Sequence, residues 1–110
     1  MLFRSAFGSG PGHLPATTLV GIAGLDNGCR VRMDAVATTS RDRESFCDKD
    51  LPMAEGSLCH GVRVGNLVFL SGVDATDGRG NSAVPLTIQA QTTETLSRIR
   101  RLLEIGRAHV

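Results

Sequence analysis

The stretch HGVRVGNLVFLSG, residues 60–72, decides the fold of the C-terminal half of this chain. It contains two short runs rich in β-branched and aliphatic residues, 61–64 and 67–70, separated by the pair Gly65-Asn66. Residues of this kind favour strands, and a glycine-containing pair between two such runs is typical of a β-hairpin. The stretch therefore predicts two antiparallel strands joined by a tight turn.

A long helix is predicted after the polar loop at 72–85. Thr87 lies just beyond Pro85 and is a suitable N-cap, and Glu94 stands four residues before Arg98 in the favourable order for an ion pair. Apolar residues recur at spacings of about three and four or their sums, as on one helix face: Ile88, Leu96, Ile99, Leu102 and Leu103. The pattern predicts a C-terminal helix that continues past Glu104.

A second hairpin is predicted upstream. Residues 16–23 are apolar and β-branched, residues 29–37 alternate between apolar and polar side chains, and Asp26-Asn27-Gly28 stands between them. Alternation of period two is typical of a half-buried strand, and Asn-Gly is the strongest short-range hairpin signal. Residues 1–7 resemble the last turns of a further helix, which the glycine-rich stretch at 8–12 ends.

Residues 39–57 carry charges of both signs and few apolar side chains, a composition typical of a solvated linker. We therefore expect this segment to lie outside any sheet. The whole order predicts an α+β chain with two β-hairpins and one long C-terminal helix. Because no further strands cover the sheet, we expect Phe69, Leu70 and Leu96 to remain partly exposed.

The composition excludes several classes of protein. Twelve basic and eleven acidic residues leave a net charge of +1, so no basic surface favours nucleic acid. The longest apolar run, residues 19–25, is far shorter than the about 20 residues of a membrane span. No apolar leader precedes Pro11 and Pro15, so we expect no signal peptide, no membrane partner and a cytoplasmic location.

No motif predicts a metal or a cofactor. The three cysteines, Cys29, Cys47 and Cys59, are widely spaced and are expected to be free thiols. The glycine-rich stretch at 8–12 follows no strand, which argues against a dinucleotide site. A calcium loop aligned on Gly78 would place Val73 and Ala75 at positions that require oxygen ligands.

Two parts of the chain resemble the Rid (YjgF-like) family of reactive-intermediate deaminases. Residues 60–72, with IQAQT at 88–92 and Leu96, resemble the family's opening strands and first long helix. Residues 1–38, with LPATTLV at 14–20 and VRMDAVA at 31–37, resemble the family's closing segments, "PAR" and "VEIEAIA". The resemblance implies parts of a chorismate-mutase-like fold.

The closing half precedes the opening half, which predicts the junction of a tandem protein. Residues 1–38 are then the end of a first domain, 39–57 the linker, and 58–104 the start of a second domain. A circular permutant that completes one domain from both halves is the alternative. The last residues, 105–110, are IGRAHV, which resembles the translation of a common sequencing adapter and predicts an extraneous tail; a genuine short tail is the alternative.

The resemblance also implies which positions of this chain correspond to the family's binding site. The family's arginine in "PAR", which holds the substrate carboxylate, corresponds to Thr17, and the glutamate in "VEIEA" corresponds to Arg32. The tyrosine that lines the pocket corresponds to Leu58, so only the "SG" turn, Ser71-Gly72, matches in residue type. Arg32, beside Arg30, is either a relocated anion clamp or part of a solvated strand face. We expect no catalytic residue and no metal ligand in this chain.

The resemblance implies a parent protein that hydrolyses enamine or imine intermediates of the 2-aminoacrylate type to a keto acid and ammonia, without metal or cofactor. Its substrate bears a small carboxylate, and trimer-like homo-oligomers form the clefts. The alternative is a non-catalytic module that binds small carboxylates or only assembles a trimer. The family's older association with ribonuclease activity is disfavoured here, because neutral charge and scarce aromatic residues suit nucleic acid poorly.

Overall fold

The β-hairpin predicted from residues 60–72 is the centre of the fold in the computed structural model, which describes residues 14–108. Strands β2 (Gly61–Val64) and β3 (Leu67–Leu70) pair antiparallel, with Gly61 opposite Leu70 and Val64 opposite Leu67. Gly65 has a φ of 57°, and this positive angle at the first turn position suits glycine. The prediction is therefore confirmed.

A third strand extends this sheet, and it arises from the segment expected to be a linker. Strand β1 (Arg43–Phe46) pairs antiparallel with β2, so the sheet order is β1-β2-β3. The prediction that residues 39–57 lie outside the sheet is wrong. A strand forms in this otherwise polar segment because the aromatic side chain of Phe46 is buried, and its burial stabilises the pairing with β2.

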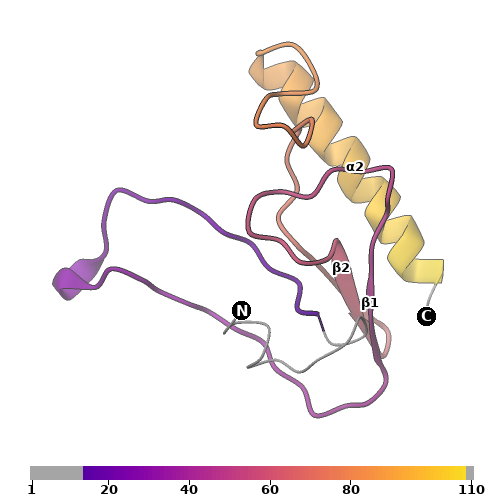
Figure 1. Cartoon of the computed structure of the whole chain (residues 1–110). Coiled ribbons are helices and arrows are strands. Elements are labelled where there is room, and N and C mark those ends of the chain that lie inside the picture. Colours follow the sequence, from indigo (N-terminus) through magenta and orange to yellow (C-terminus); the bar gives the residue numbers. More distant parts are fainter. Residues whose placement is uncertain (1–13, 109–110) are drawn as a thin grey trace.

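Helix α2 (Ile88–Ala108) packs against β2 and β3, so the general α+β class is confirmed (Figure 1). The Thr87 hydroxyl accepts a hydrogen bond from the Ala90 N–H at 3.1 Å, as expected of an N-cap. The Glu94–Arg98 ion pair is also present, at 3.0 Å. Residues 105–108 of the expected tail continue the helix, whereas 109–110 lie outside the described residues, as does the helix end predicted at 1–7.

The buried face of α2 differs from the predicted apolar face. Arg98, Leu102 and Gly106, spaced four residues apart, face inward, and Leu102 alone comes from the predicted set. Leu96 is 60% exposed, Phe69 is 36% exposed and Leu70 is half-buried, so the partial exposure expected of these three side chains is confirmed. The inward face is set by close approach to the sheet, which a glycine permits and a larger side chain would prevent.

The close approach centres on the ring of Phe46, which lies between two glycines. A β-carbon added to Gly106 of α2 would come 3.0 Å from Phe46 Cζ and 2.9 Å from Val68 Cγ1. A β-carbon added to Gly61 of β2 would come 2.9 Å from Phe46 Cε1. The ring therefore fills the space between helix and sheet that the two missing β-carbons leave.

The second predicted hairpin has its turn but not its strands. The 3-10 turn η2 (Asp26–Gly28) has positive φ at Asn27 (58°) and Gly28 (71°), and the Cys29 N–H donates to the Asp26 carbonyl at 3.2 Å. This is the geometry of the type I′ hairpin turn. Residues 16–23 and 29–37, however, contain no strand, so the prediction of a second hairpin there is wrong.

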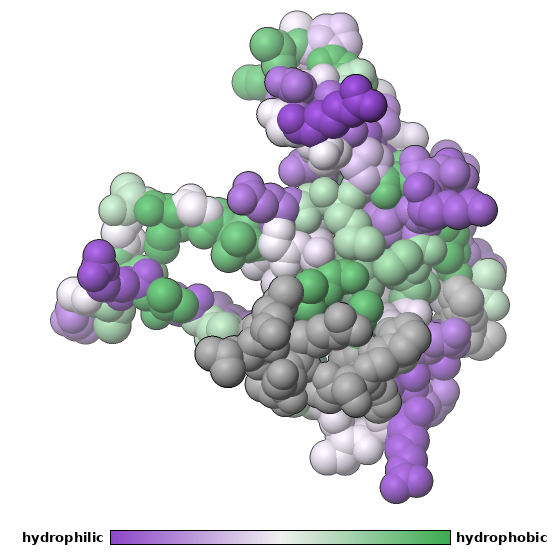
Figure 2. All heavy atoms as spheres, viewed as in Figure 1, coloured by the Kyte–Doolittle hydropathy of each residue, from purple (hydrophilic) through white to green (hydrophobic). Residues whose placement is uncertain are grey.

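The unpaired segments project from the body of the molecule as an open arm (Figure 1). Val31 is 78% exposed and Val36 is 83% exposed, and hydrophobic side chains are visible along the arm in Figure 2. A two-stranded ribbon is marginal in water unless another surface covers its apolar face. Within residues 14–108 no element covers the arm, which explains why the correct turn does not lead to a ladder.

Candidate functional site

Three of the five residues that the resemblance assigns to a site, Thr17, Ser71 and Gly72, meet in the structure, although Thr17 and Ser71 are 54 positions apart. The Thr17 N–H donates to the Ser71 hydroxyl at 3.0 Å, and the Gly72 N–H donates to the Thr17 carbonyl at 3.0 Å. Ser71 and Gly72 directly follow β3, while Thr17 belongs to the extended segment after residue 13. This junction is the candidate site.

The polar groups of the Ser71-Gly72 turn are already occupied. The Ser71 hydroxyl is buried; it donates to the Cys59 carbonyl at 2.6 Å and accepts from Thr17. The Gly72 N–H is bonded to Thr17, and the Ser57 hydroxyl also donates to the Thr17 carbonyl at 3.2 Å. A ligand that needs these donors would have to displace the segment around Thr17.

Arg32 does not join this junction. Its side chain is 72% exposed and forms an ion pair with Asp34 at 3.4 Å on the arm. Within residues 14–108 it has no contact with Ser71 or Gly72, so the structure gives it the solvated position rather than that of an anion clamp. Leu58, at the expected tyrosine position, is half-buried and lies next in sequence to buried Cys59.

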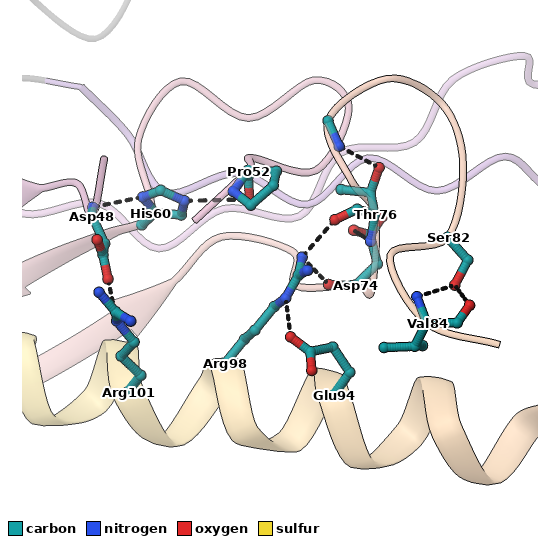
Figure 3. A network of polar contacts seen from close by, with 11 residues as sticks. Asp48, Pro52, His60, Asp74, Thr76, Ser82, Val84, Glu94, Arg98 and Arg101 are labelled. Carbon is teal, nitrogen blue, oxygen red and sulfur yellow. Dashed lines mark hydrogen bonds and ion pairs between the residues drawn. The ribbon is translucent and has the colours of Figure 1, made fainter. Parts of the chain in front are cut away.

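The sequence does not indicate the polar network that joins the loop after β1 to His60 and to α2. The Asp48 N–H donates to His60 Nδ1 at 2.9 Å, and the Asp48 carboxylate bonds to the Arg101 guanidinium from α2 (Figure 3). His60 Nε2 faces the Pro52 carbonyl at 3.5 Å. Since Nδ1 accepts, the proton of the neutral ring lies on Nε2.

This network is suited to holding structure rather than to proton transfer. Both His60 ring nitrogens face backbone groups, so neither is directed at a substrate. Burial alone raises the pKa of the Asp48 carboxyl, but the Asp50 N–H and Arg101 outweigh burial and hold that pKa below its ordinary value of 3.8. The carboxylate is therefore a fixed anion that ties the loop after β1 to α2.

Cys59 is not a nucleophile in this fold. Its side chain is fully buried, and Sγ lies 3.4 Å from the carbonyl oxygens of both Pro15 and Gly61. Burial raises the pKa of the Cys59 thiol to about 11, which keeps the unreactive protonated form at neutral pH. Cys29 and Cys47 are free and exposed, as expected of unpaired thiols.

A groove of about 820 Å³ lies between the loop after β3 and the N-terminal half of α2. Its charged lining residues are Glu55 and Asp74, and its other polar lining comes from hydroxyl and amide side chains. A groove whose charged groups are carboxylates repels an anionic substrate. It is therefore a poor position for the small carboxylate that the resemblance implies.

The signals for the missed network were weak in the sequence. The Cys59-His60 pair adjoins a clear strand, but Asp48 and Arg101 are separated by 53 positions, and only the fold brings them together. Among residues 14–108, no group of three or more His, Cys, Asp or Glu side chains could hold a metal ion. No described helix has the length and apolar character needed to cross a membrane.

Comparisons with known proteins give no relative for this chain: no family model, no curated protein and no solved structure matches it.

Proposed function

We propose that this chain is part of a Rid-family protein whose relatives hydrolyse enamine or imine intermediates of the 2-aminoacrylate type to a keto acid and ammonia. The observation that carries the proposal is the junction of Thr17 with Ser71 and Gly72. The resemblance assigns these positions to one ligand site although it draws them from opposite halves of the chain. Their meeting supports the carried-over site, and the α+β arrangement is compatible with it.

The chain itself is proposed to be inactive. Recognition of a carboxylate requires a charge-assisted donor such as the guanidinium fork of arginine, and Thr17 has only a hydroxyl. Hydrogen bonds to a charged group each contribute about 1.5–3 kcal/mol, so the missing fork costs most of the orienting interaction. Arg32 also provides a cation where the family pattern has a carboxylate.

A specific observation favours the non-catalytic alternative for this chain. The Ser71 hydroxyl and the Gly72 N–H are both bonded to Thr17, so they are not available to a carboxylate or to an attacking water. Catalysis of this type relies on donors positioned in advance of the reaction. A module that has lost turnover is consistent with donors used to hold its own chain.

The arrangement of the two halves bears on the parent protein. Strand β1 lies within the expected linker and pairs with β2, and residues 14–18 reach the end of β3. Both contacts support the alternative in which the two halves contribute to one folded unit. The reading frame beyond residue 104 distinguishes the tandem from the permutant, because a tandem must repeat the "PAR" and "VEIEA" segments there.

The test is ammonia and keto-acid release from enzymatically generated 2-aminoacrylate, measured for the chain, for buffer and for a Thr17→Arg, Arg32→Glu variant. We expect the unaltered chain to match buffer. Clear acceleration by the unaltered chain would contradict the inactive site. The full-length parent provides the test of the family proposal: no acceleration by a parent that carries the complete arginine and glutamate segments would overturn it.

A further inference from the structure

Residues 14–19 lie in a site built to hold an extended peptide. The site, here called the cradle, consists of Gly56, Ser57, Cys59, Ser71 and Gly72. Ser57 Oγ and the Gly72 N–H both donate to the Thr17 carbonyl, at 3.2 and 3.0 Å, and the Cys59 thiol donates to the Pro15 carbonyl at 3.4 Å. The Ser71 hydroxyl accepts from the Thr17 N–H. Each of these hydrogen bonds involves a main-chain atom of the segment.

Two glycines complete the cradle by leaving space for side chains of the segment. A β-carbon at Gly72 would come 3.2 Å from Thr18 Cγ2. A β-carbon at Gly56, which has a φ of 83°, would come 2.9 Å from Leu19 Cδ2. The cradle therefore accommodates both the main chain and the side chains of an extended peptide, as sites of strand addition do.

The connection from this segment to strand β1, residues 20–41, is not packed on the rest of the molecule. Its hydrogen bonds stay local: Cys29 bonds to Asp26, Arg32 to Asp34 and Ser40 to Thr38. The chain bonds to the sheet again at Asp42, directly after the connection, where the carboxylate accepts from Arg63 at 3.0 Å. The described part of the chain thus has a docked segment on a long, loosely attached connection.

The connection exposes apolar side chains that a monomer leaves in water. Those on its two sides are Val20, Ile22, Val31, Met33 and Val36, each at least 60% exposed. They flank a type I′ turn, the turn that fits the twist of paired strands. Apolar surface in water costs about 25 cal/mol per Å², so pairing this arm with another strand is favourable.

We propose that residues 14–19 dock in the cradle of a second copy of this chain, giving a reciprocal, strand-exchanged dimer. Because the cradle forms hydrogen bonds with main-chain atoms of the segment, the same hydrogen bonds can form within one chain or between two chains. At about 3.3 Å per residue the connection spans up to about 70 Å, more than the 43 Å longest dimension of the molecule. Exchange also brings two arms together and covers their apolar side chains, which is a low-cost route to a dimer. The inference does not depend on the proposed enzyme family.

Complementation between two variants tests the exchange. Gly72→Leu fills the cradle but leaves the segment intact, whereas Thr17→Pro removes the N–H that Ser71 receives but leaves the cradle intact. Under reducing conditions, sedimentation velocity should show each variant alone as a monomer and an equimolar mixture as a dimer. The unaltered chain and the surface control Thr93→Leu should both dimerise. A monomeric mixture, or a dimer formed by either variant alone, overturns the proposal.

A measurement on the unaltered chain covers the case in which either variant fails to fold. Isotope-labelled and unlabelled copies are mixed, unfolded and refolded together, and nuclear Overhauser contacts are filtered to pass only between copies. We expect a contact between the Thr18 methyl group and the Gly72 α-protons across two chains. If this contact occurs only within one copy, the segment docks in cis and the proposal is overturned.

Discussion

The Arg98 guanidinium of α2 lies 2.8 Å from the carbonyl oxygen of Thr76 and 3.0 Å from that of Asp74. Its Nε also donates to Glu94, one turn earlier, at 3.0 Å (Figure 3). The Arg98 side chain is buried, whereas Glu94, Asp74 and Thr76 are each at least partly exposed. One side chain therefore attaches the loop after β3 to the helix.

Replacement of Arg98 by methionine should lower the free energy of unfolding by about 2–4 kcal/mol, because two backbone carbonyls and one carboxylate lose a charged donor. Urea-induced unfolding of the variant and the unaltered chain, at equal concentration, measures the difference. The matched control is Arg100→Met, which removes only the exposed Arg100–Glu104 pair. That variant should change stability by less than about 0.5 kcal/mol, and equal losses in the two variants would contradict the role of Arg98.

Addition of a methyl group at Gly61 should destabilise the chain by about 1–3 kcal/mol, since the new β-carbon meets the Phe46 ring and the Phe69 carbonyl. A double-mutant cycle with Phe46→Leu tests the cause, because a smaller side chain relieves part of the overlap. The cost of Gly61→Ala should fall in the Phe46→Leu background. Gly24→Ala, where nothing lies within 4 Å, serves as the control. Additive costs would show that the ring is not responsible.

The three thiols should differ sharply in alkylation. Cys29 and Cys47 are exposed, whereas Cys59 is buried and its pKa is raised from 9.0 to about 11. Iodoacetamide at about pH 8 should modify Cys29 and Cys47 and spare Cys59 until the chain is unfolded, because the thiolate is the nucleophile. Mass spectrometry of peptides before and after urea treatment gives the readout. Rapid modification of Cys59 in the folded chain would contradict its burial.

The same thiol gives stability a defined dependence on alkaline pH. The folded pKa lies above the unfolded value, so the contribution of Cys59 is fully present below about pH 9 and is lost as the pH rises through about 11. A Cys59→Ala variant should lack this part of the alkaline decline. Unfolding free energies measured across this range, with Cys29→Ala as the control, separate the buried thiol from an exposed one.

Asp48 should give a dependence of opposite sign at acid pH. Its folded pKa lies below the ordinary value of 3.8, so its stabilising contribution is present above that value and is lost as the pH falls through the folded pKa. Asp48→Asn should be less stable at neutral pH and should show a weaker acid dependence than the unaltered chain. Asp34→Asn, which removes an exposed carboxylate on the arm, is the control variant. An unaltered slope in Asp48→Asn would contradict the assignment.

Local patterns predicted the elements that local interactions determine. The β2–β3 hairpin depends on a glycine at a positive φ, and the start of α2 depends on the Thr87 hydroxyl, three residues from its partner. Strand β1 was missed because three of its residues, Arg43, Glu44 and Ser45, are polar. Its pairing depends on the second edge of β2 and on one aromatic ring, which no short window of sequence reveals.

Alternation at 29–37 predicts a strand because a period of two is typical of a half-buried surface. In the arm, the alternating pattern and the type I′ turn are both present, but no paired strands form because no other surface covers their apolar side chains. The resemblance assigns Thr17, Ser71 and Arg32 to one site. The structure brings Thr17 and Ser71 into contact, whereas Arg32 lies on the arm. The Asp48–His60–Arg101 network joins residues far apart in the chain, so only tertiary structure brings them together.

The ring of Phe46 also makes the separation of helix and sheet observable. A flat ring held between the backbones of Gly61 and Gly106 can rotate by a half-turn only when α2 moves away from β2. Its rotation therefore occurs at the rate at which the two layers part, a collective motion on the microsecond-to-millisecond scale rather than a local rotamer change. The two sides of the ring should give separate proton resonances that merge on warming. The temperature at which they merge would report how often the helix lifts from the sheet.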